Sequence, residues 1–135
     1  MINVKIGFKE MIARADAEID SISPMEILDL RQNDKFLLID IRDVRELERD
    51  GMIPGAFHCP RGMMEFWVHP ESPYHKSIFS EDRKFIFYCA SGWRSALTAK
   101  AAKDIGLSPV AHIKGGFTAW CNTGGPVTEK SRKNR

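Results

Sequence analysis

One cysteine in the chain stands where its thiol could act as a nucleophile. Cys89 follows an apolar run, Phe85 to Tyr88, and precedes a short loop and an alanine-rich stretch from Arg94 to Ile105. The apolar run predicts a buried strand, and the alanine-rich stretch, ended by Gly106, predicts a helix. Cys89 is therefore expected at the carboxyl end of a strand, which is where open α/β sheets bind ligands.

The start of the predicted helix would stabilise a thiolate. Helix N-termini present free N–H groups and the positive end of the helix dipole, and a nearby guanidinium adds to that field. Gly92 suits a loop that curls tightly with a positive φ, and the Ser95 hydroxyl can donate to the same nest. Arg94 has two candidate roles: it docks an anion, or it pairs with a carboxylate that holds the loop. We expect Cys89 to be catalytic and the substrate to bind at Ala90, Ser91, Gly92, Trp93, Arg94 and Ser95.

A lone cysteine at a strand end is more often a small buried hydrophobe, but the spacing Cys-x-x-Gly-x-Arg-Ser between a strand and a helix favours chemistry. This segment resembles the signature of single-domain rhodaneses, a sulfurtransferase family. The segment from Leu38 to Ala56 resembles the family's Asp-Val-Arg…Glu…Gly-His-Ile-Pro-Gly-Ala pattern, with Met52 in place of the histidine. Gly115 to Trp120 and Gly124 to Val127 resemble its closing motif. The resemblance covers residues 18–128.

The resemblance implies a rhodanese-like reaction that needs no cofactor and no metal. Cys89 would take the outer sulfur of a small anionic donor such as thiosulfate, form a persulfide, and pass the sulfur to cyanide or a thiol. A sulfur-relay or binding module that serves a partner protein, with little small-molecule turnover, is the alternative. Four residues separate Cys89 from Arg94, whereas the related dual-specificity phosphatases have five there. The smaller ring suits one sulfur atom and favours sulfur over phosphate.

The rest of the chain reads as strands alternating with helices, which predicts a single α/β domain with a mostly parallel central sheet flanked by helices on both faces. Strands are expected at residues 18–22, 36–41, 56–58, 85–88 and 110–113. Helices are expected at 2–17, 24–32, 44–49, 61–69, 94–105 and 117–122, with a surface excursion at 70–82. The expected divisions are an N-terminal helical extension (1–17), a rhodanese-like domain (18–128) and a basic C-terminal tail (129–135).

Charge and cysteine content favour a reduced, cytoplasmic protein. The formal net charge is +2, but the tail from Glu129 onward holds four of the cations, so nucleic-acid binding is not expected. No signal peptide is readable, and no uncharged stretch is long and apolar enough to span a bilayer. The three cysteines form no even set and no CxxC pair, which argues against a disulfide framework or a zinc site.

Other residues receive structural interpretations. Asp40 and Arg42 are expected to brace the fold as a buried ion pair, and Trp120 is expected in the core. The Trp93 side chain could either face solvent or form one wall of the site, and the sequence does not distinguish the two. Cys59 and Cys121 lack a loop context and are expected to be unreactive core or near-surface thiols. The four histidines show no metal-ligand spacing: His58, His69, His75 and His112.

Overall fold

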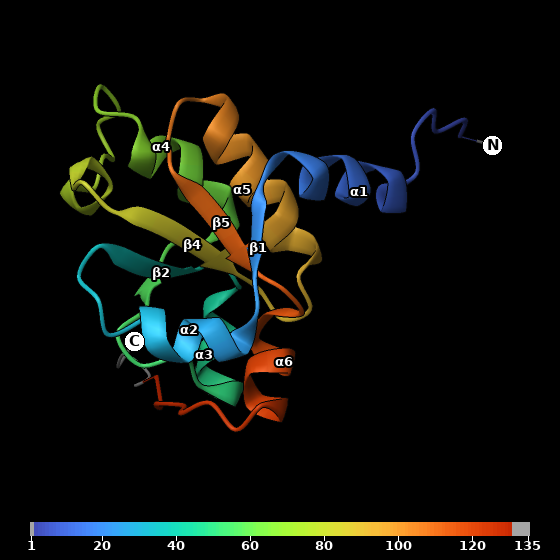
Figure 1. Ribbon diagram of the computed structural model, residues 1–135. Helices are drawn as coiled ribbons and strands as arrows, with labels where there is room; N and C mark the ends of the chain where they lie inside the picture. Colours follow the sequence, from blue (N-terminus) through green and yellow to red (C-terminus); the bar gives the residue numbers. More distant parts are fainter. Residues whose placement is uncertain (1, 131–135) are drawn as a thin grey trace.

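The central feature of the fold is a five-stranded sheet in the order β1-β5-β4-β2-β3, in which every pairing is parallel (Figure 1). The computed structural model describes residues 2–130. The strands are β1 (Asp20–Ile22), β2 (Phe36–Asp40), β3 (Phe57–His58), β4 (Lys84–Tyr88) and β5 (Val110–Ile113). The predicted parallel sheet is confirmed, with β4 at its centre and the predicted edge strand, β1, at one side.

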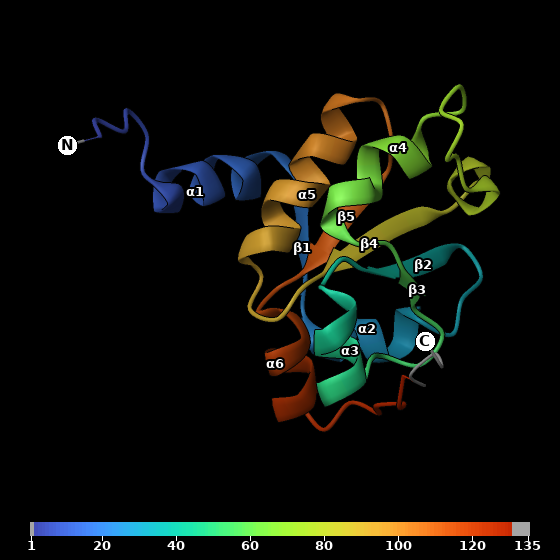
Figure 2. The ribbon, with the colours of Figure 1, turned by 180° about the vertical axis from the view of Figure 1, so that it is seen from behind.

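Helices cover both faces of the sheet, as predicted (Figures 1 and 2). On one face lie α1 (Phe8–Glu18), α4 (Met64–Val68) and α5 (Trp93–Asp104). On the other lie α2 (Pro24–Leu30), α3 (Val44–Asp50) and α6 (Gly116–Asn122). Two short 3₁₀ turns complete the described elements: η1 (Arg61–Met63) and η2 (Ser77–Ser80).

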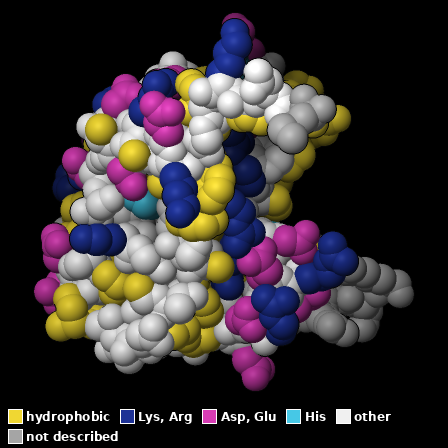
Figure 3. Space-filling view, turned by 90° about the vertical axis from the view of Figure 1, so that its right-hand side faces the viewer, with side chains coloured by type: hydrophobic (Ala, Val, Ile, Leu, Met, Phe, Trp, Pro, Cys, Tyr) yellow, Lys and Arg dark blue, Asp and Glu magenta, His cyan; other side chains and the backbone are white. Residues whose placement is uncertain are grey.

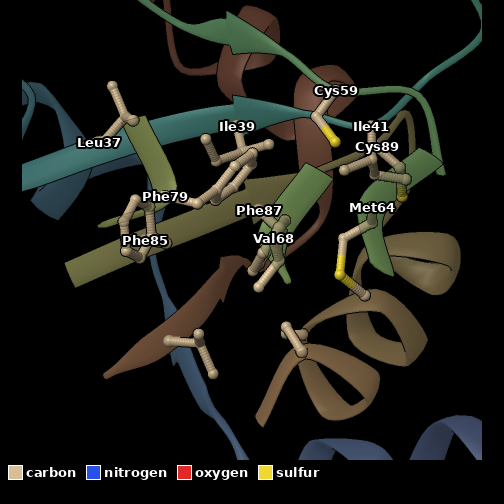
Figure 4. Close-up of a cluster of buried hydrophobic side chains, with 13 residues drawn as sticks. Leu37, Ile39, Ile41, Cys59, Met64, Val68, Phe79, Phe85, Phe87 and Cys89 are labelled. Carbon is tan, nitrogen blue, oxygen red and sulfur yellow. The ribbon is translucent and has the colours of Figure 1, made fainter. Parts of the chain in front are cut away.

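Two hydrophobic cores lie on either side of the sheet. The core under α4 and α5 is shown in Figure 4, where Cys59, Met64 and Cys89 group at one end and Phe79 and Phe85 at the other. The second core, under α2 and α6, includes the fully buried Trp120, which confirms the prediction for this residue. The reactive-cysteine candidate is therefore packed into the edge of a core, which restricts its motion.

Two sequence predictions need correction. The N-terminal helix was predicted over 2–17, but α1 begins at Phe8. The early apolar residues Ile2 and Val4 are 87% and 71% exposed, so no core packing supports a longer helix. The predicted surface excursion at 70–82 contains η2, whose Phe79 is buried against the rings of Phe57 and Phe85. This segment is therefore partly anchored in the core.

The helix ends follow local chemistry. Ser23 caps α2 by accepting the N–H of Glu26, and the Ser23 hydroxyl donates to the Glu26 carboxylate. The helix ends at Leu30, two residues before the predicted end at Gln32. Asp43 and Glu46 form a reciprocal capping box at the start of α3. These caps set the first residues of α2 and α3.

The described surface carries mixed charge. Figure 3 shows the side of the molecule that bears α1 and α6, where acidic and basic side chains are interspersed. No helix within residues 2–130 is long and apolar enough to cross a lipid bilayer. The same residues contain no group of three or more potential metal ligands. Most of the predicted basic tail, residues 131–135, lies outside the described part of the chain.

Candidate active site

Cys89 lies directly after the central strand β4, at the carboxyl end of the parallel sheet. Its side chain faces inward and the residue is only 1% exposed. The Sγ atom accepts the backbone N–H of Gly92 at 3.1 Å and that of Ser95 at 3.4 Å. Donors aimed at a sulfur atom favour its anionic form. The predicted group of donors around the sulfur is therefore present, and the role of Cys89 as a nucleophile stays a prediction.

The loop closes around the sulfur because Gly92 has a φ of 102°, as predicted for this position. Gly92 is the N-cap of α5, and the first intrahelical bond runs from Ala96 N–H to its carbonyl. The N–H groups of the first turn therefore have no partner within the helix. Ser95 is buried, Ala90 is half-buried, and Ser91, Trp93 and Arg94 are exposed. All six predicted binding residues thus lie in one turn around the Cys89 sulfur.

The start of α6 holds the outer side of this loop. Phe117 N–H donates to the carbonyl of Cys89 at 2.7 Å, and Thr118 N–H donates to that of Ala90 at 3.0 Å. Gly116 has a φ of 64°, and a Cβ there would lie 2.5 Å from the Cys89 carbonyl oxygen. Only glycine permits this approach. The two bonds from α6 therefore fix the orientation of the Cys89 and Ala90 carbonyls at the start of the loop.

Arg94 pairs with Glu46, so the structure shows the loop-bracing contact among the two roles considered for it. Two hydrogen bonds, of 2.8 and 2.9 Å, join the guanidinium to the carboxylate. The Arg94 contact holds the pKa of Glu46 below its usual range, and the carboxylate raises the pKa of Arg94. The pair ties the first turn of α5 to α3 on the opposite face of the sheet.

The described structure adds a histidine to the site that the sequence analysis left without a role. His112, in β5, places Nδ1 2.9 Å from Ser95 Oγ, which in turn lies 3.5 Å from Cys89 Sγ. Its Nε2 lies 2.9 Å from Asp16 Oδ1 of α1 and 3.0 Å from Ser21 Oγ of β1. The available signal was a histidine inside an apolar strand that ends beside Cys89.

The predicted ion pair between Asp40 and Arg42 is confirmed, and it contacts a residue that holds the Cys89 loop. The two side chains are joined at 2.8 Å and are almost entirely buried. Arg42 also donates to the Gly51 carbonyl at 2.7 Å, and its guanidinium carbon lies 4.3 Å from the centre of the Phe117 ring. Since Phe117 holds the Cys89 carbonyl, the ion pair is connected to the loop through one residue.

The other two thiols lack such a setting. Cys59 is buried, and burial raises its pKa to about 12. Cys121 is exposed, and its pKa is also raised by the desolvation around it. Trp93, left open by the sequence, is 52% exposed and packs against Phe8 with ring centres 5.0 Å apart. Among the three cysteines only Cys89 has backbone donors on its sulfur.

These features, a parallel sheet whose central strand ends in a Cys-x-x-Gly-x-Arg-Ser loop, define the class of protein. A family model described as the rhodanese-like domain matches residues 23–123. The chain belongs to the rhodanese-like family. Its relatives include proteins named as sulfurtransferases, which supports sulfur transfer as its general chemistry.

Two such relatives cover most of the chain. A sulfurtransferase of Allochromatium vinosum is 33% identical over 110 residues, which is 82% of this chain and 92% of the relative. The putative sulfurtransferase YtwF of Bacillus subtilis is 30% identical over 104 residues, 76% of this chain and 91% of the relative.

Two solved structures are also similar to this chain over nearly its full length. One, from Rhodopseudomonas palustris, is described as a protein of unknown function and possible tyrosine phosphatase. It is 51% identical, with a TM-score of 0.91, over 95% of this chain and 98% of its own. The polysulfide-sulfur transferase homodimer of Wolinella succinogenes is 26% identical, with a TM-score of 0.68, over 95% of this chain and 91% of its own.

Proposed function

We propose that this protein is a sulfurtransferase that carries sulfane sulfur as a persulfide on Cys89. The observation that carries the proposal is the pair of backbone N–H groups, from Gly92 and Ser95, directed at Cys89 Sγ. A persulfide adds one sulfur and keeps the negative charge, so it needs the same kind of donors as a thiolate. The remaining N–H groups of the first turn of α5 supply them, in the manner of an oxyanion hole.

The reaction proceeds in two displacements. The Cys89 thiolate attacks the outer sulfur of a donor such as thiosulfate, an S–S bond forms, and sulfite leaves with the electron pair of the broken bond. An acceptor nucleophile, cyanide or a thiol, then attacks the terminal sulfur and restores the thiolate. With cyanide the product is thiocyanate. No redox partner is needed, because each step exchanges one sulfur bond for another.

Sulfur is preferred to phosphate as the transferred group because of two features of the loop. Four residues separate Cys89 from Arg94, which makes a narrow ring around the sulfur. The Arg94 guanidinium is also engaged by both carboxylate oxygens of Glu46, instead of being free to clamp a phosphoryl group. A phosphatase would need such a clamp for the charge of its transition state.

The experiment is a mass measurement. The protein is incubated with thiosulfate, its intact mass is recorded, and thiocyanate is measured after cyanide is added. We expect one added sulfur on Cys89 and its loss to cyanide. Cys89→Ser should abolish both, while Cys59→Ser and Cys121→Ser retain them. A folded native chain that gains no sulfur from thiosulfate, mercaptopyruvate or glutathione persulfide contradicts the proposal.

A second candidate is delivery of the sulfur to a partner protein, with slow turnover on small molecules. The observation that favours it is the exposed aromatic pair of Phe8 and Trp93 beside the loop, since exposed aromatic side chains are typical of protein contacts. Recovery of partners from cell extract by the Cys89→Ser protein tests this candidate. A matched chain ending at Thr128 tells whether the basic tail contributes. Rapid thiocyanate production with no partner recovered would argue against it.

A further inference from the structure

A line of hydrogen bonds leads from the Cys89 thiol to the surface of the N-terminal helix. Cys89 Sγ lies 3.5 Å from Ser95 Oγ, and Ser95 Oγ lies 2.9 Å from His112 Nδ1. On the far side of the ring, His112 Nε2 lies 2.9 Å from Asp16 Oδ1 and 3.0 Å from Ser21 Oγ. Residues of α1, β1, α5 and β5 therefore join the Cys89 loop in one continuous chain of polar atoms.

The chemistry of the groups sets the direction of these bonds. An ionised carboxylate only accepts hydrogen bonds, so Nε2 of His112 carries a proton and its N–H donates a hydrogen bond to Asp16. In the neutral ring Nδ1 is then an acceptor, which takes the hydroxyl proton of Ser95. The Ser95 oxygen keeps lone pairs that face the Cys89 S–H. Every donor in the line points away from the thiol, so a proton can move outward along it.

The surroundings suit a proton acceptor. His112 is 3% exposed, and burial lowers its pKa, although Asp16 opposes that effect. The ring is therefore neutral near neutral pH and free to accept a proton. It borders a cavity of about 320 Å³ whose charged lining residues are Asp16 and Lys114, one of each sign. The Asp16 side chain is 44% exposed, which gives the line an end in solvent.

We propose that Ser95, His112 and Asp16 form a proton relay that removes the thiol proton of Cys89 before the sulfur attacks its substrate. The S–H bond breaks as the sulfur's proton passes to Ser95 Oγ, and the hydroxyl proton of Ser95 passes to His112 Nδ1. The products are a thiolate and an imidazolium whose charge is balanced by Asp16. The Ser95 hydroxyl then points at the thiolate, so the same step adds a donor to the group around the sulfur. The relay rests on the proposed function for its nucleophile.

Part of this relay lies outside the residues that the family model matches. The family match covers residues 23–123, whereas Asp16 and Ser21 precede it. The N-terminal helix thus supplies a positioning residue for the active site instead of serving only as an extension. A structural role, in which the bonds merely fasten α1 and β1 to β5, predicts losses that do not depend on pH. A proton relay predicts losses that do.

The test compares pH profiles in the full chain. Persulfide formation from thiosulfate in a single turnover, and alkylation of Cys89 by iodoacetamide, are measured between about pH 6 and pH 9.5, where free thiols pass from protonated to ionised. The variants are His112→Gln, which keeps a polar side chain of similar reach, and Asp16→Asn, which keeps the shape and removes the charge. Glu18→Gln is the control for Asp16→Asn: it also replaces a carboxylate by an amide on α1, at a residue paired with Lys100. Thermal melting confirms that each variant folds.

His112→Gln should slow both reactions at least about tenfold near pH 6.5 and recover to within about threefold of the native rate near pH 9.5, where a thiol ionises without a base. Asp16→Asn should show a smaller loss on the same acidic side, and Glu18→Gln should match the native profile. Equal losses at every pH, or no loss, in a folded His112→Gln protein overturns the relay. If the native chain forms no persulfide but its alkylation profile still changes in His112→Gln, the relay is supported and the proposed function is not.

Discussion

Arg94 and Glu46 form a two-pronged ion pair across 48 residues of sequence: Nη1 to Oε2 is 2.8 Å and Nη2 to Oε1 is 2.9 Å. The carboxylate belongs to the capping box of α3, so it is itself held by the backbone N–H of Asp43 at 3.0 Å. The guanidinium belongs to Arg94, which lies in the first turn of α5, directly after the loop around Cys89. Anchoring one wall of the cysteine loop to a fixed helix end keeps the donors aligned before any substrate arrives.

Loss of the Arg94 charge should make the Cys89 thiol less reactive at acidic pH. In Arg94→Ala we expect the rate of alkylation by iodoacetamide to fall about threefold on the acidic side of neutrality, because a nearby cation no longer favours the anionic sulfur. Arg94→Lys should have a smaller effect on alkylation, since lysine keeps the positive charge but cannot form the two-pronged contact with Glu46. An unchanged profile in Arg94→Ala would show that the residue braces the loop without acting on the thiolate.

The ion pair between Arg94 and Glu46 should make the free energy of unfolding depend on pH in the acidic range. Arg94 holds the pKa of Glu46 below its usual range, so the contact stabilises the protein above about pH 4.3, the ordinary glutamate value, and is lost as the pH falls through the lower folded value. Because Arg94 is partly exposed, Glu46→Gln should cost about 1 kcal/mol or less at neutral pH. Urea unfolding at several pH values measures this difference, which should shrink to near zero in acid. Glu10→Gln, on the exposed face of α1, is the control.

A methyl group at position 116 should displace the Cys89 loop, because it would collide with the loop backbone. The Cβ of Gly116→Ala would lie 2.5 Å from the Cys89 carbonyl oxygen, and the backbone has a positive φ there. The loop or the start of α6 must shift, at a cost of about 1–3 kcal/mol in stability, and sulfur transfer should fall at least about tenfold. Thiocyanate production and thermal melting are the measurements. Gly55→Ala is the control, since its φ is also positive but nothing lies within 4 Å of the added methyl; a transfer rate that falls equally in both contradicts the argument.

Removal of one partner of the buried pair under the site should be severe. Asp40→Asn leaves the Arg42 charge buried without its carboxylate, and we expect a loss of about 3–5 kcal/mol in the free energy of unfolding. The double change Asp40→Leu with Arg42→Met replaces both charges by apolar side chains and should recover most of that loss. Denaturant unfolding of the three proteins measures the effect. A double variant as unstable as Asp40→Asn would show that the Arg42 bond to Gly51 outweighs the burial of charge.

The preference for sulfur depends on the size of the loop. One glycine inserted after Gly92 widens the ring and displaces the Ser95 N–H from Cys89 Sγ. A lost donor in such a site costs about 2.7–4 kcal/mol, so sulfur transfer should fall at least about tenfold. A glycine inserted after Glu71, in an exposed turn, is the control. If both proteins release thiocyanate at the native rate, loop size does not determine the chemistry.

The sequence alone predicted most of the fold because its signals are local. Continuous apolar runs marked β2 and β4, and alanine content followed by Gly106 marked α5, to within a residue or two of the observed ends. The N-terminal helix was predicted six residues too early, because periodicity counts Val4 as a core residue and cannot see that nothing covers it. The burial of Phe79 was not predicted, because a single aromatic residue in a turn-rich segment forms no periodic pattern.

The candidate site was predictable only where one segment carries it. The turn from Cys89 to Ser95 is contiguous, so spacing was enough. Glu46, His112 and Asp16 reach the same turn from other elements, and their distances depend on the order of strands in the sheet. No periodicity or composition encodes that order. Only His112, a polar residue inside an apolar strand, carried a signal of its own, and that signal does not say which residues it meets.

The position of β1 has a consequence for how short the chain can be made. β1 pairs with β5 along Asp20–Ile22 and is the outermost strand, so it covers the hydrogen-bonding edge of the apolar segment from Val110 to Ile113. A chain trimmed to the family limits, residues 23–123, would leave that edge open. Open apolar edges pair with one another. Such a fragment should associate through β5 and elute at larger size in gel filtration, whereas a fragment beginning at Phe8 should elute as the full chain does.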